Sequence, residues 1–549
     1  MSPGPAMSDD AYDYIVVGAG TAGCVLANRL SADPSVRVAL IEAGPRDTHP
    51  WIHIPAAVGA AIVTPKLGWG YATAPQAHMG GRRIPIPRGR VLGGCSSING
   101  MVYNRGHPRD YDDWAAMGNA GWSYREVLPY FLRSEDNARF AGSPFHGHGG
   151  EMAVTDIART NPMNAAFFEA MEALQVRRCP DFNGPDPEGY GYRQATICGG
   201  RRESMATAFL RPVRGRRNLQ VVTDSPARRV LIEQGRAVGV ELTGPGGVRT
   251  LRARREVVLA AGAIGSPQLL LLSGVGDGAA LQALGLEVQH HLPAVGANLQ
   301  DHLAVLVQML MRDTSSYGIS LRAAPRGAWN ILEYLLFRQG PLASFVFEAN
   351  AFLKTLPTLD RPDIQLVFQP ARRNRTSFPI PVGHGFVGSS VLLYPKSRGS
   401  VSLASPRPED AAVIDPNLLA DPADYEPLLR AIAFCRRVFA TPAFARYRAA
   451  EFKPGPEAQD EAALRAYIRD TGSTVHHPAG TCRMGTREDA VVDPQLRVRG
   501  VEGLRVADAS IFPRLVGGNT NAVVVMVAEK AADLILGRPQ LAAAELEAA

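Results

Sequence analysis

The sequence predicts an α/β protein that contains a Rossmann-like dinucleotide-binding unit and, in its second half, an α+β region in which an antiparallel sheet is flanked by helices. Three observations predict this fold. Residues 12–42 read as strand, glycine turn, helix, strand and acid, which is a complete βαβ unit. Residues 228–259 alternate in a strand–turn–strand pattern. Residues 310–470 mix strand-like runs with helical stretches, a spacing typical of an antiparallel sheet covered by helices.

The βαβ unit carries the pattern Gly18-x-Gly20-x-x-Gly23 between an apolar run and a helical stretch. Gly18 permits the tight turn, Gly20 lets the backbone approach a pyrophosphate at the helix N-terminus, and Gly23 allows close packing of helix on strand. Glu42, 24 residues after Gly18 at the end of the next strand, can accept hydrogen bonds from a ribose diol. The predicted dinucleotide contacts are Gly18, Gly20, Thr21, Ala22, Gly23 and Glu42. NAD and FAD both use this unit, so the motif alone does not choose between them.

The segments that follow are assigned from the positions of their glycine, serine and charged residues. Residues 85–106 are rich in Gly, Arg and Ser, which indicates a long functional loop. Residues 244–247 supply the turn of the strand–turn–strand region. Residues 257–276 contain no charge and are long enough to cross a membrane, but glycines interrupt them. We therefore expect a strand at 257–260, a turn, and a helix at 266–272.

The second half of the chain supplies the elements of the α+β domain. Strand-like runs occupy residues 364–368 and 387–393. Helical stretches occupy residues 426–440 and 461–469.

Composition excludes several classes of protein. The chain has 549 residues, of which 46% are hydrophobic and 20% charged, so a disordered, collagen-like or coiled-coil chain is excluded. The length is compatible with three or four sequential domains or with a large two-domain enzyme. A net charge of +6 is compatible with binding to nucleic acid. The basic clusters are short, however, so we expect the basic residues to form a solvated surface and predict no nucleic-acid partner.

Six scattered cysteines show no C-x-x-C pair and no zinc spacing, so we expect no metal site and a reducing compartment. Residues 1–10 lack the basic and apolar regions of a signal peptide, and no transmembrane segment is expected. These observations predict a cytoplasmic protein and leave open a peripheral association with the inner membrane.

Three further sequence blocks indicate whether the dinucleotide is NAD or FAD. They are Gly89-Arg-Val-Leu-Gly-Gly-Cys-Ser-Ser-Ile-Asn-Gly-Met101, Ala260-Ala-Gly-Ala-Ile-Gly-Ser-Pro267, and His476-His-Pro-Ala-Gly-Thr-Cys-Arg-Met-Gly485 with its continuation to residue 522. Together with the βαβ unit, these blocks resemble the glucose–methanol–choline (GMC) oxidoreductases, a family of FAD enzymes acting on alcohols. The resemblance runs from residue 12 to about residue 537, and is closest to bacterial choline dehydrogenases and aliphatic alcohol dehydrogenases.

The resemblance implies two interleaved domains. The FAD-binding domain is expected at residues 11–155, 205–310 and 471–540, and the substrate-binding domain at residues 156–204 and 311–470.

The resemblance also implies cofactor contacts. Arg90, Gly93 and Gly94 would run along the pyrophosphate, and Asn99, Gly100, Met101 and Val102 would line the isoalloxazine. Asp508 and Ala509 match the segment near the pyrophosphate and ribityl chain, with a buried structural role as the alternative for Asp508. The remaining assigned contacts are Val230, Ala261 and Thr520. Some members of the family carry a flavin-linked His where this chain has Ile98, so we expect noncovalent FAD.

Two residues are expected to carry the chemistry. Neutral imidazole suits removal of a hydroxyl proton near neutral pH, and in the family the His before Pro-x-Gly-Thr, here His477, is the active-site base. The second residue of the family is a His or Asn ten positions before a helical Glu, which gives Asn519 before Glu529. Asn519 would orient the substrate oxygen and stabilise its developing negative charge.

The predicted function is oxidation of a primary alcohol to an aldehyde by hydride transfer to flavin N5, with electrons passed to a quinone or another acceptor. An O₂-using oxidase that forms H₂O₂ is one alternative, and a lyase or photodecarboxylase on the same fold is another. The alcohol cannot be identified from the sequence, and the oligomeric state stays open. The five tryptophans show no convergent spacing, so we expect core packing for them and not a cage for a quaternary amine.

Overall fold

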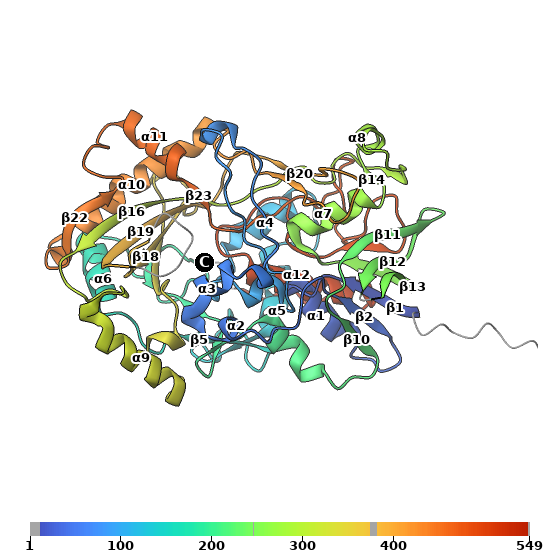
Figure 1. The fold of residues 1–549 in the computed structure, drawn as a ribbon, viewed down its shortest axis with the longest axis horizontal. Helices are drawn as coiled ribbons and strands as arrows, with labels where there is room; N and C mark the ends of the chain where they lie inside the picture. Colours follow the sequence, from blue (N-terminus) through green and yellow to red (C-terminus); the bar gives the residue numbers. More distant parts are fainter. Residues whose placement is uncertain (1–10, 245, 374–381, 547–549) are drawn as a thin grey trace, which may run out of the picture.

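The computed structural model describes residues 11–244, 246–373 and 382–546. The expectation for a missing signal peptide concerns residues 1–10, which lie outside this range. Two large sheets stand side by side, the first around β1 and β13 and the second around β16 and β19 (Figure 1). Each sheet has its own hydrophobic core. The predicted α/β fold with an antiparallel second sheet is confirmed.

The first sheet has seven strands in the order β10–β2–β1–β13–β12–β11, with β24 on the free part of β13. Its bounds are β1 Ala11–Val17, β2 Val38–Ile41, β10 Leu219–Val222, β11 Ala227–Glu233, β12 Arg236–Gly244, β13 Gly247–Leu259 and β24 Leu504–Val506. The strands β10, β2, β1, β13 and β24 are parallel, whereas β11 and β12 extend the sheet in antiparallel fashion. The predicted βαβ unit and the strand–turn–strand region are both present.

Helices cover the first sheet. They are α1 Thr21–Leu30, α5 Tyr124–Ser134, α7 Gly262–Leu272 and α12 Asn521–Ile535. Helix α1 packs on α12, and α12 on α5. The central strand β1 is apolar and buried along almost its whole length, as expected for a parallel strand covered on both faces.

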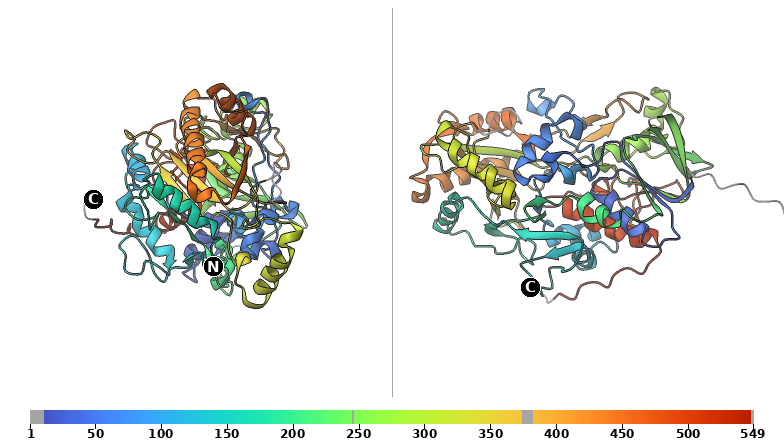
Figure 2. Two further views of the ribbon diagram at one scale, coloured as in Figure 1. Left: turned by 90° about the vertical axis from the view of Figure 1, so that its left-hand side faces the viewer. Right: turned by 60° about the horizontal axis from the view of Figure 1, so that its bottom comes forward.

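The second sheet has the order β22–β16–β19–β18–β17–β6, with β23 on β16. Its strands are β6 Gly189–Tyr192, β16 Leu303–Met311, β17 Ala349–Leu353, β18 Ile364–Gln369, β19 Gly385–Leu392, β22 Arg448–Lys453 and β23 Ser473–Thr474. All pairs are antiparallel. Helices α6 Met163–Ala173, α10 Tyr425–Ala440 and α11 Glu461–Thr471 lie on it (Figure 2). The strands and helices predicted in this half of the chain agree within a few residues.

Strand β16 starts before an expected domain boundary. Residues up to 310 were assigned to the FAD-binding domain, but β16 begins at Leu303 and pairs with β19, β22 and β23 of the second sheet. We therefore propose that the change of domain falls just before Leu303.

Short elements complete the chain. The helices are α2 Pro50–His53, α3 Val58–Val63, α4 Pro108–Ala116, α8 Gly278–Ala283 and α9 Ala324–Phe337. The strands are β3 Val102–Tyr103, β4 Glu135–Asn137, β5 Met152–Asp156, β7 Gln194–Ala195, β8 Ile197–Cys198, β9 Arg201–Arg202, β14 Val275–Gly276, β15 His290–His291, β20 Ser400–Ser402 and β21 Val413–Asp415. Among the described residues, no helix has the length and apolarity needed to cross a membrane.

The tryptophans divide into two groups. Trp114 and Trp122 are fully buried in the first core, as expected. Trp51, Trp69 and Trp329 are exposed, so the expectation of core packing is wrong for these three. Their neighbours in sequence gave no sign of this difference.

Candidate active site

A cavity of about 1900 Å³ lies between the two sheets. Seventeen of the twenty predicted site residues line it. The three that do not are Gly23, Gly93 and Val230. Segments more than 500 residues apart in sequence, from Gly18 to Asn521, meet at its wall. Within the described chain, no cluster of three or more His, Cys, Asp or Glu side chains could hold a metal ion.

The turn between β1 and α1 forms one end of the cavity. Gly18, Gly20, Thr21 and Ala22 line it, and the N-cap residue Gly20 offers no side chain to cap the helix. The first backbone N–H groups of α1 are therefore available to an anion. Gly23 faces the strand instead, where a Cβ would collide with the carbonyl oxygen of Gly18.

Glu42 lies at the carboxyl end of β2 and is buried beside this turn. Its carboxylate accepts hydrogen bonds from the backbone N–H groups of Ala19, at 3.0 Å, and Gly44, at 2.9 Å. Burial raises the pKa of Glu42 to about 7, while the backbone donors act in the opposite direction. The carboxylate is thus fixed in place, and its remaining lone pairs are free to accept from a ribose hydroxyl.

The Gly-rich loop forms a second wall. Gly94 lies against the turn: a Cβ on it would stand 2.6 Å from the Cα of Gly20. Gly93 packs away from the cavity, toward Ser97. The guanidinium of Arg90 stacks over the ring of Trp69 at 5.1 Å. The exposed ring of Trp69 thus holds the side chain of Arg90 at the cavity wall.

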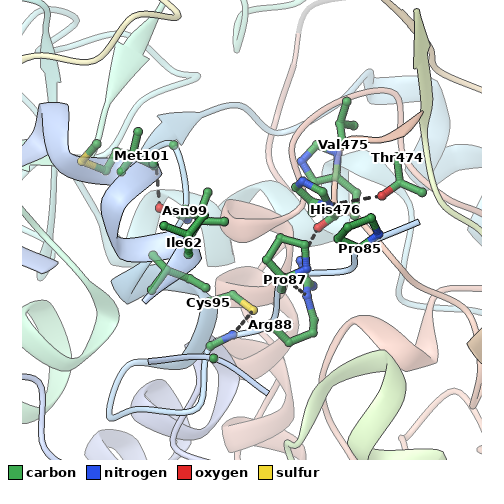
Figure 3. Close-up of a pocket in the computed structure, with 18 of the residues that line it drawn as sticks. Ile62, Pro85, Pro87, Arg88, Cys95, Asn99, Met101, Thr474, Val475 and His476 are labelled. Atoms are coloured by element: carbon green, nitrogen blue, oxygen red, sulfur yellow. Dashed lines mark hydrogen bonds between the residues drawn. The ribbon is translucent and has the colours of Figure 1, made fainter. Parts of the chain in front are cut away.

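The end of the same loop is held rigidly. Asn99 Oδ1 accepts from the backbone N–H of Met101 at 3.0 Å and from Arg202 at 2.9 Å. Gly100 and Val102 line the cavity beside these residues. Figure 3 shows Asn99 and Met101 on one side of the space and the segment of His476 on the other.

A third wall comes from the C-terminal part of the chain. Asp508 accepts hydrogen bonds from the backbone N–H of Gly262, from Ser266 and from the backbone N–H of Ser510, at 2.6–2.8 Å. It therefore clamps the start of α7, which fits the structural alternative for this residue. Ala261, Ala509 and Thr520 line the cavity nearby.

Val230 lies away from the cavity. Its side chain is buried in the core, and its backbone N–H donates to Ser273 Oγ at 2.8 Å. Ala227 and Arg228, earlier in the same strand, line the cavity in its place. The structure thus gives no support to a cofactor contact at Val230, because the part of β11 that reaches the cavity is its beginning.

His477 and Asn519 meet at the cavity wall, and hydrogen bonds fix the tautomer of His477. His302 Nε2 lies 3.0 Å from the carbonyl oxygen of Leu393 and must donate to it. His302 Nδ1 is then an acceptor, 2.9 Å from His477 Nδ1, which donates. His477 Nε2 is left unprotonated, 3.2 Å from the side-chain amide nitrogen of Asn519. A buried lone pair thus stands ready to accept a proton.

The electrostatics keep this imidazole neutral. Burial lowers the pKa of His477 well below its usual range, and the neighbouring His302 and Arg88 act in the same direction. Burial also lowers the pKa of His302 to about 4 and that of His476 to about 3. All three imidazoles are therefore uncharged at neutral pH, which the tautomer assignment for His302 and His477 requires.

The backbone around His477 is also fixed. Asp301 accepts a hydrogen bond from the backbone N–H of His477 at 2.8 Å, and its second oxygen is buried without a partner among the described residues. Burial raises the pKa of Asp301 to about 7. Arg88 donates to the carbonyl oxygen of His476, a residue at φ +69° (Figure 3). The strained conformation of His476 turns the chain so that His477 can face Asn519.

Sequence reasoning missed Asp301, His302 and Arg193. The first two form a polar pair directly before the apolar run of β16. That position is a signal, because a polar pair at the start of a buried strand needs a buried partner. The fold and this cavity define a two-domain dinucleotide-binding enzyme with a buried, neutral histidine at the cavity wall.

Comparisons with known proteins give the family. Residues 12–304 match the N-terminal and residues 395–528 the C-terminal sequence model of GMC oxidoreductases. The chain belongs to the GMC oxidoreductase family. An alcohol dehydrogenase [acceptor] of Pseudomonas putida is 44% identical over 97% of both chains. An oxygen-dependent choline dehydrogenase of Rhizobium etli is 41% identical over 97% of both chains.

Solved structures agree with this membership. Pyridoxine 4-oxidase from Mesorbium loti has a TM-score of 0.88 at 34% identity, covering 96% of this chain and 100% of its own. An FAD-dependent oxidoreductase from Chaetomium thermophilum has a TM-score of 0.87 at 25% identity, covering 96% and 99%. A formate oxidase of Aspergillus oryzae, studied for the modification of its FAD, has a TM-score of 0.89 at 26% identity, covering 97% and 99%.

Proposed function

We propose that the chain is an FAD-dependent alcohol dehydrogenase that oxidises a primary alcohol to the aldehyde and passes the electrons to a quinone or another acceptor. One observation carries the proposal: the hydrogen bonds from Leu393 through His302 leave His477 Nε2 as an unprotonated base beside Asn519. The names of the relatives from Pseudomonas putida and Rhizobium etli support the class of reaction.

The residues of the cavity fit FAD. The first turn of α1 offers free N–H groups to a pyrophosphate, Glu42 offers acceptors to a ribose, and the backbone of Gly94 leaves a slot without side chains against Gly20. The orphaned Oδ1 of Asn519 is a further acceptor beside the reacting position. When bound, the flavin would take up the hydride of the alcohol carbon.

The protein residues handle the proton and the oxygen. The hydroxyl of the substrate displaces the amide of Asn519 from His477 Nε2 and donates its proton there. The amide of Asn519 then donates to the substrate oxygen and stabilises its negative charge. His302 holds the imidazole in the required tautomer throughout, because its Nε2 proton is committed to Leu393.

Anaerobic mixing of the enzyme with primary alcohols tests this proposal. The visible absorbance of the flavin should fall on reduction and return when a quinone is added. Absence of bleaching with every alcohol would overturn the redox proposal and favour the lyase or photodecarboxylase alternative. Stoichiometric H₂O₂ formation in air, with slow reduction of a dye under argon, would assign the chain as an oxidase instead.

Removal of the flavin provides a test of its attachment. Ile98, which lines the cavity where some relatives carry a flavin-linked His, has no atom able to form the bond. We expect acid precipitation or SDS to release all of the flavin into the supernatant, as measured by its absorbance. Yellow colour that stays with the polypeptide would contradict noncovalent binding.

A peripheral membrane association is also proposed. Helix α9 stands at the edge of the molecule (Figure 1). Its exposed apolar side chains include Trp329, Leu332 and Leu336, whose spacing along the helix puts them on one face. Arg326 lies in the first turn of α9, and Arg322 and Arg338 flank the helix in sequence. Arginines beside exposed apolar side chains suit an anionic lipid surface. Trp329 and Arg326 also line the cavity, so docking would bring its mouth to the membrane.

We expect the double change Leu332→Glu and Leu336→Glu to weaken binding to vesicles of phosphatidylglycerol and phosphatidylcholine about tenfold or more, since each buried Leu contributes about 1.5–3 kcal/mol. Co-sedimentation measures the bound fraction. The control is Val248→Glu, which changes an equally exposed apolar residue on β13. Equal binding of both variants would refute the role of α9.

A further inference from the structure

One buried cation in the cavity has no counter-charge. Arg193 lies between β6 and β7, is 5% exposed, and lines the cavity. The Nε group donates to Asn350 Oδ1, a neutral acceptor, whereas Nη2 is buried without a partner among the described residues. Among the other buried arginines, Arg105 pairs with Glu135 and Arg505 with Glu256. Arg202 also lacks a carboxylate partner, but it does not line the cavity and it donates to three backbone carbonyl groups.

The nearest candidate for a counter-charge is already in use. Glu348 sits one residue before the strand that holds Asn350, and its backbone carbonyl accepts from the N–H of Arg193. The carboxylate of Glu348, however, accepts from Tyr317, from the backbone N–H of Asn161 and from Asn164. No described carboxylate therefore pairs with the guanidinium of Arg193.

Burial without a partner is costly for a charged group, so buried charges are normally paired. Burial lowers the pKa of Arg193 to about 9, which still leaves the guanidinium protonated at neutral pH. Other arginines also line the cavity, among them Arg88 and Arg372. An unpaired, buried cation that lines a substrate cavity is the arrangement expected when the missing anion arrives with the ligand.

Arg193, His477 and Asn519 line the same cavity. The charge of Arg193 also contributes to lowering the pKa of His477. A ligand of moderate length can therefore reach Arg193 with one end while its other end lies between His477 and Asn519.

We propose that the substrate is a hydroxy acid, whose carboxylate pairs with Arg193 while its primary hydroxyl is held by His477 and Asn519. The proposal rests on the proposed function and names its substrate class. The CH₂OH group becomes CHO: the hydroxyl proton goes to His477, the hydride goes to the flavin, and the carboxylate is unchanged. The same positive field disfavours choline, whose quaternary ammonium would meet Arg193 and Arg88.

The test compares ω-hydroxycarboxylates with their neutral methyl esters of equal length. The wild-type enzyme should show the higher kcat/KM for the acids. In Arg193→Met, kcat/KM for the acids should fall on the order of 10²-fold, since losing one partner of a buried charge pair costs about 2–5 kcal/mol. The esters should change less than about threefold. Arg193→Lys should keep part of the preference for the acids.

Two controls separate structural failure from loss of recognition. The flavin content and Tm of both variants should match the wild type, and a dicarboxylate of the same length should bind the wild type but not Arg193→Met, as measured by its effect on the flavin spectrum. A wild type that oxidises the esters but not the acids would overturn the substrate class and leave the proposed function intact. An equal loss for acids and esters would also overturn it, because Arg193 would then serve the cofactor. Absence of oxidation with any alcohol would overturn both proposals.

Discussion

Replacing His477 by alanine is expected to lower kcat by a factor on the order of 10² or more, the usual loss when a general base is removed. No other described side chain presents an unprotonated nitrogen beside Asn519 in the cavity. The flavin should stay bound, because the residues proposed to hold its pyrophosphate and ribose, Gly20 and Glu42, belong to the β1–α1–β2 segment and not to the segment of His477. Stopped-flow reduction by a primary alcohol measures the rate of the chemical step directly.

The control for this variant is His291→Ala, which removes an exposed imidazole on β15 and should leave the rate unchanged. Turnover of His477→Ala close to that of the wild type would disprove the base assignment. A parallel loss of flavin would show a structural effect instead.

The pH dependence gives an independent check. The pKa of His477 lies well below 6.5, so the base is already unprotonated at neutral pH, and activity should fall only in acid solution. In the unfolded chain, His302, His476 and His477 would become protonated from about pH 6.5 downward. In the folded chain they stay neutral to a lower pH, because burial lowers their pKa values. The stability contributed by the three neutral histidines is therefore full above about pH 6.5 and is lost as the pH falls.

The sequence predicted those parts of the site that depend on local spacing. The glycine turn, the Gly-rich loop and the His477 block each lie within a short segment, so their geometry follows from neighbouring residues. Local spacing was not enough for Val230, which lies away from the cavity wall. The residues of a strand that reach a cavity are decided by the register of that strand against its neighbours.

The pairs formed across the fold could not be predicted in this way. His302 meets His477 from a position 175 residues earlier in the chain. The strands beside them in the sequence, β16 and β23, pair with each other, and this pairing joins segments that are far apart in the sequence. Arg193 could not be singled out either. It differs from other arginines in being buried without a carboxylate partner, and this can be seen only once the cavity has formed.

Replacing Gly94 by alanine is expected to weaken flavin binding about 10- to 100-fold. The backbones of Gly94 and Gly20 are in contact, and the new Cβ would lie 2.6 Å from the Cα of Gly20. Overpacking of this kind costs about 1–3 kcal/mol, and every 1.4 kcal/mol is about tenfold in affinity. The clash forces the loop away from the turn, where both residues line the cavity. The flavin content per polypeptide, followed by titration of the apoprotein with FAD, measures the effect.

The matched control is Gly80→Ala. Gly80 has φ +65° and Gly94 has φ +54°, so alanine carries a similar left-handed backbone penalty at both positions. At Gly80, however, no atom lies within 4 Å of the new Cβ. Both variants should therefore lose Tm through backbone strain, with a larger loss for Gly94→Ala because of its clash, but only Gly94→Ala should lose flavin. Equal flavin loss in the two variants would mean that strain, and not the contact between the loop and the βα turn, shapes the cofactor site.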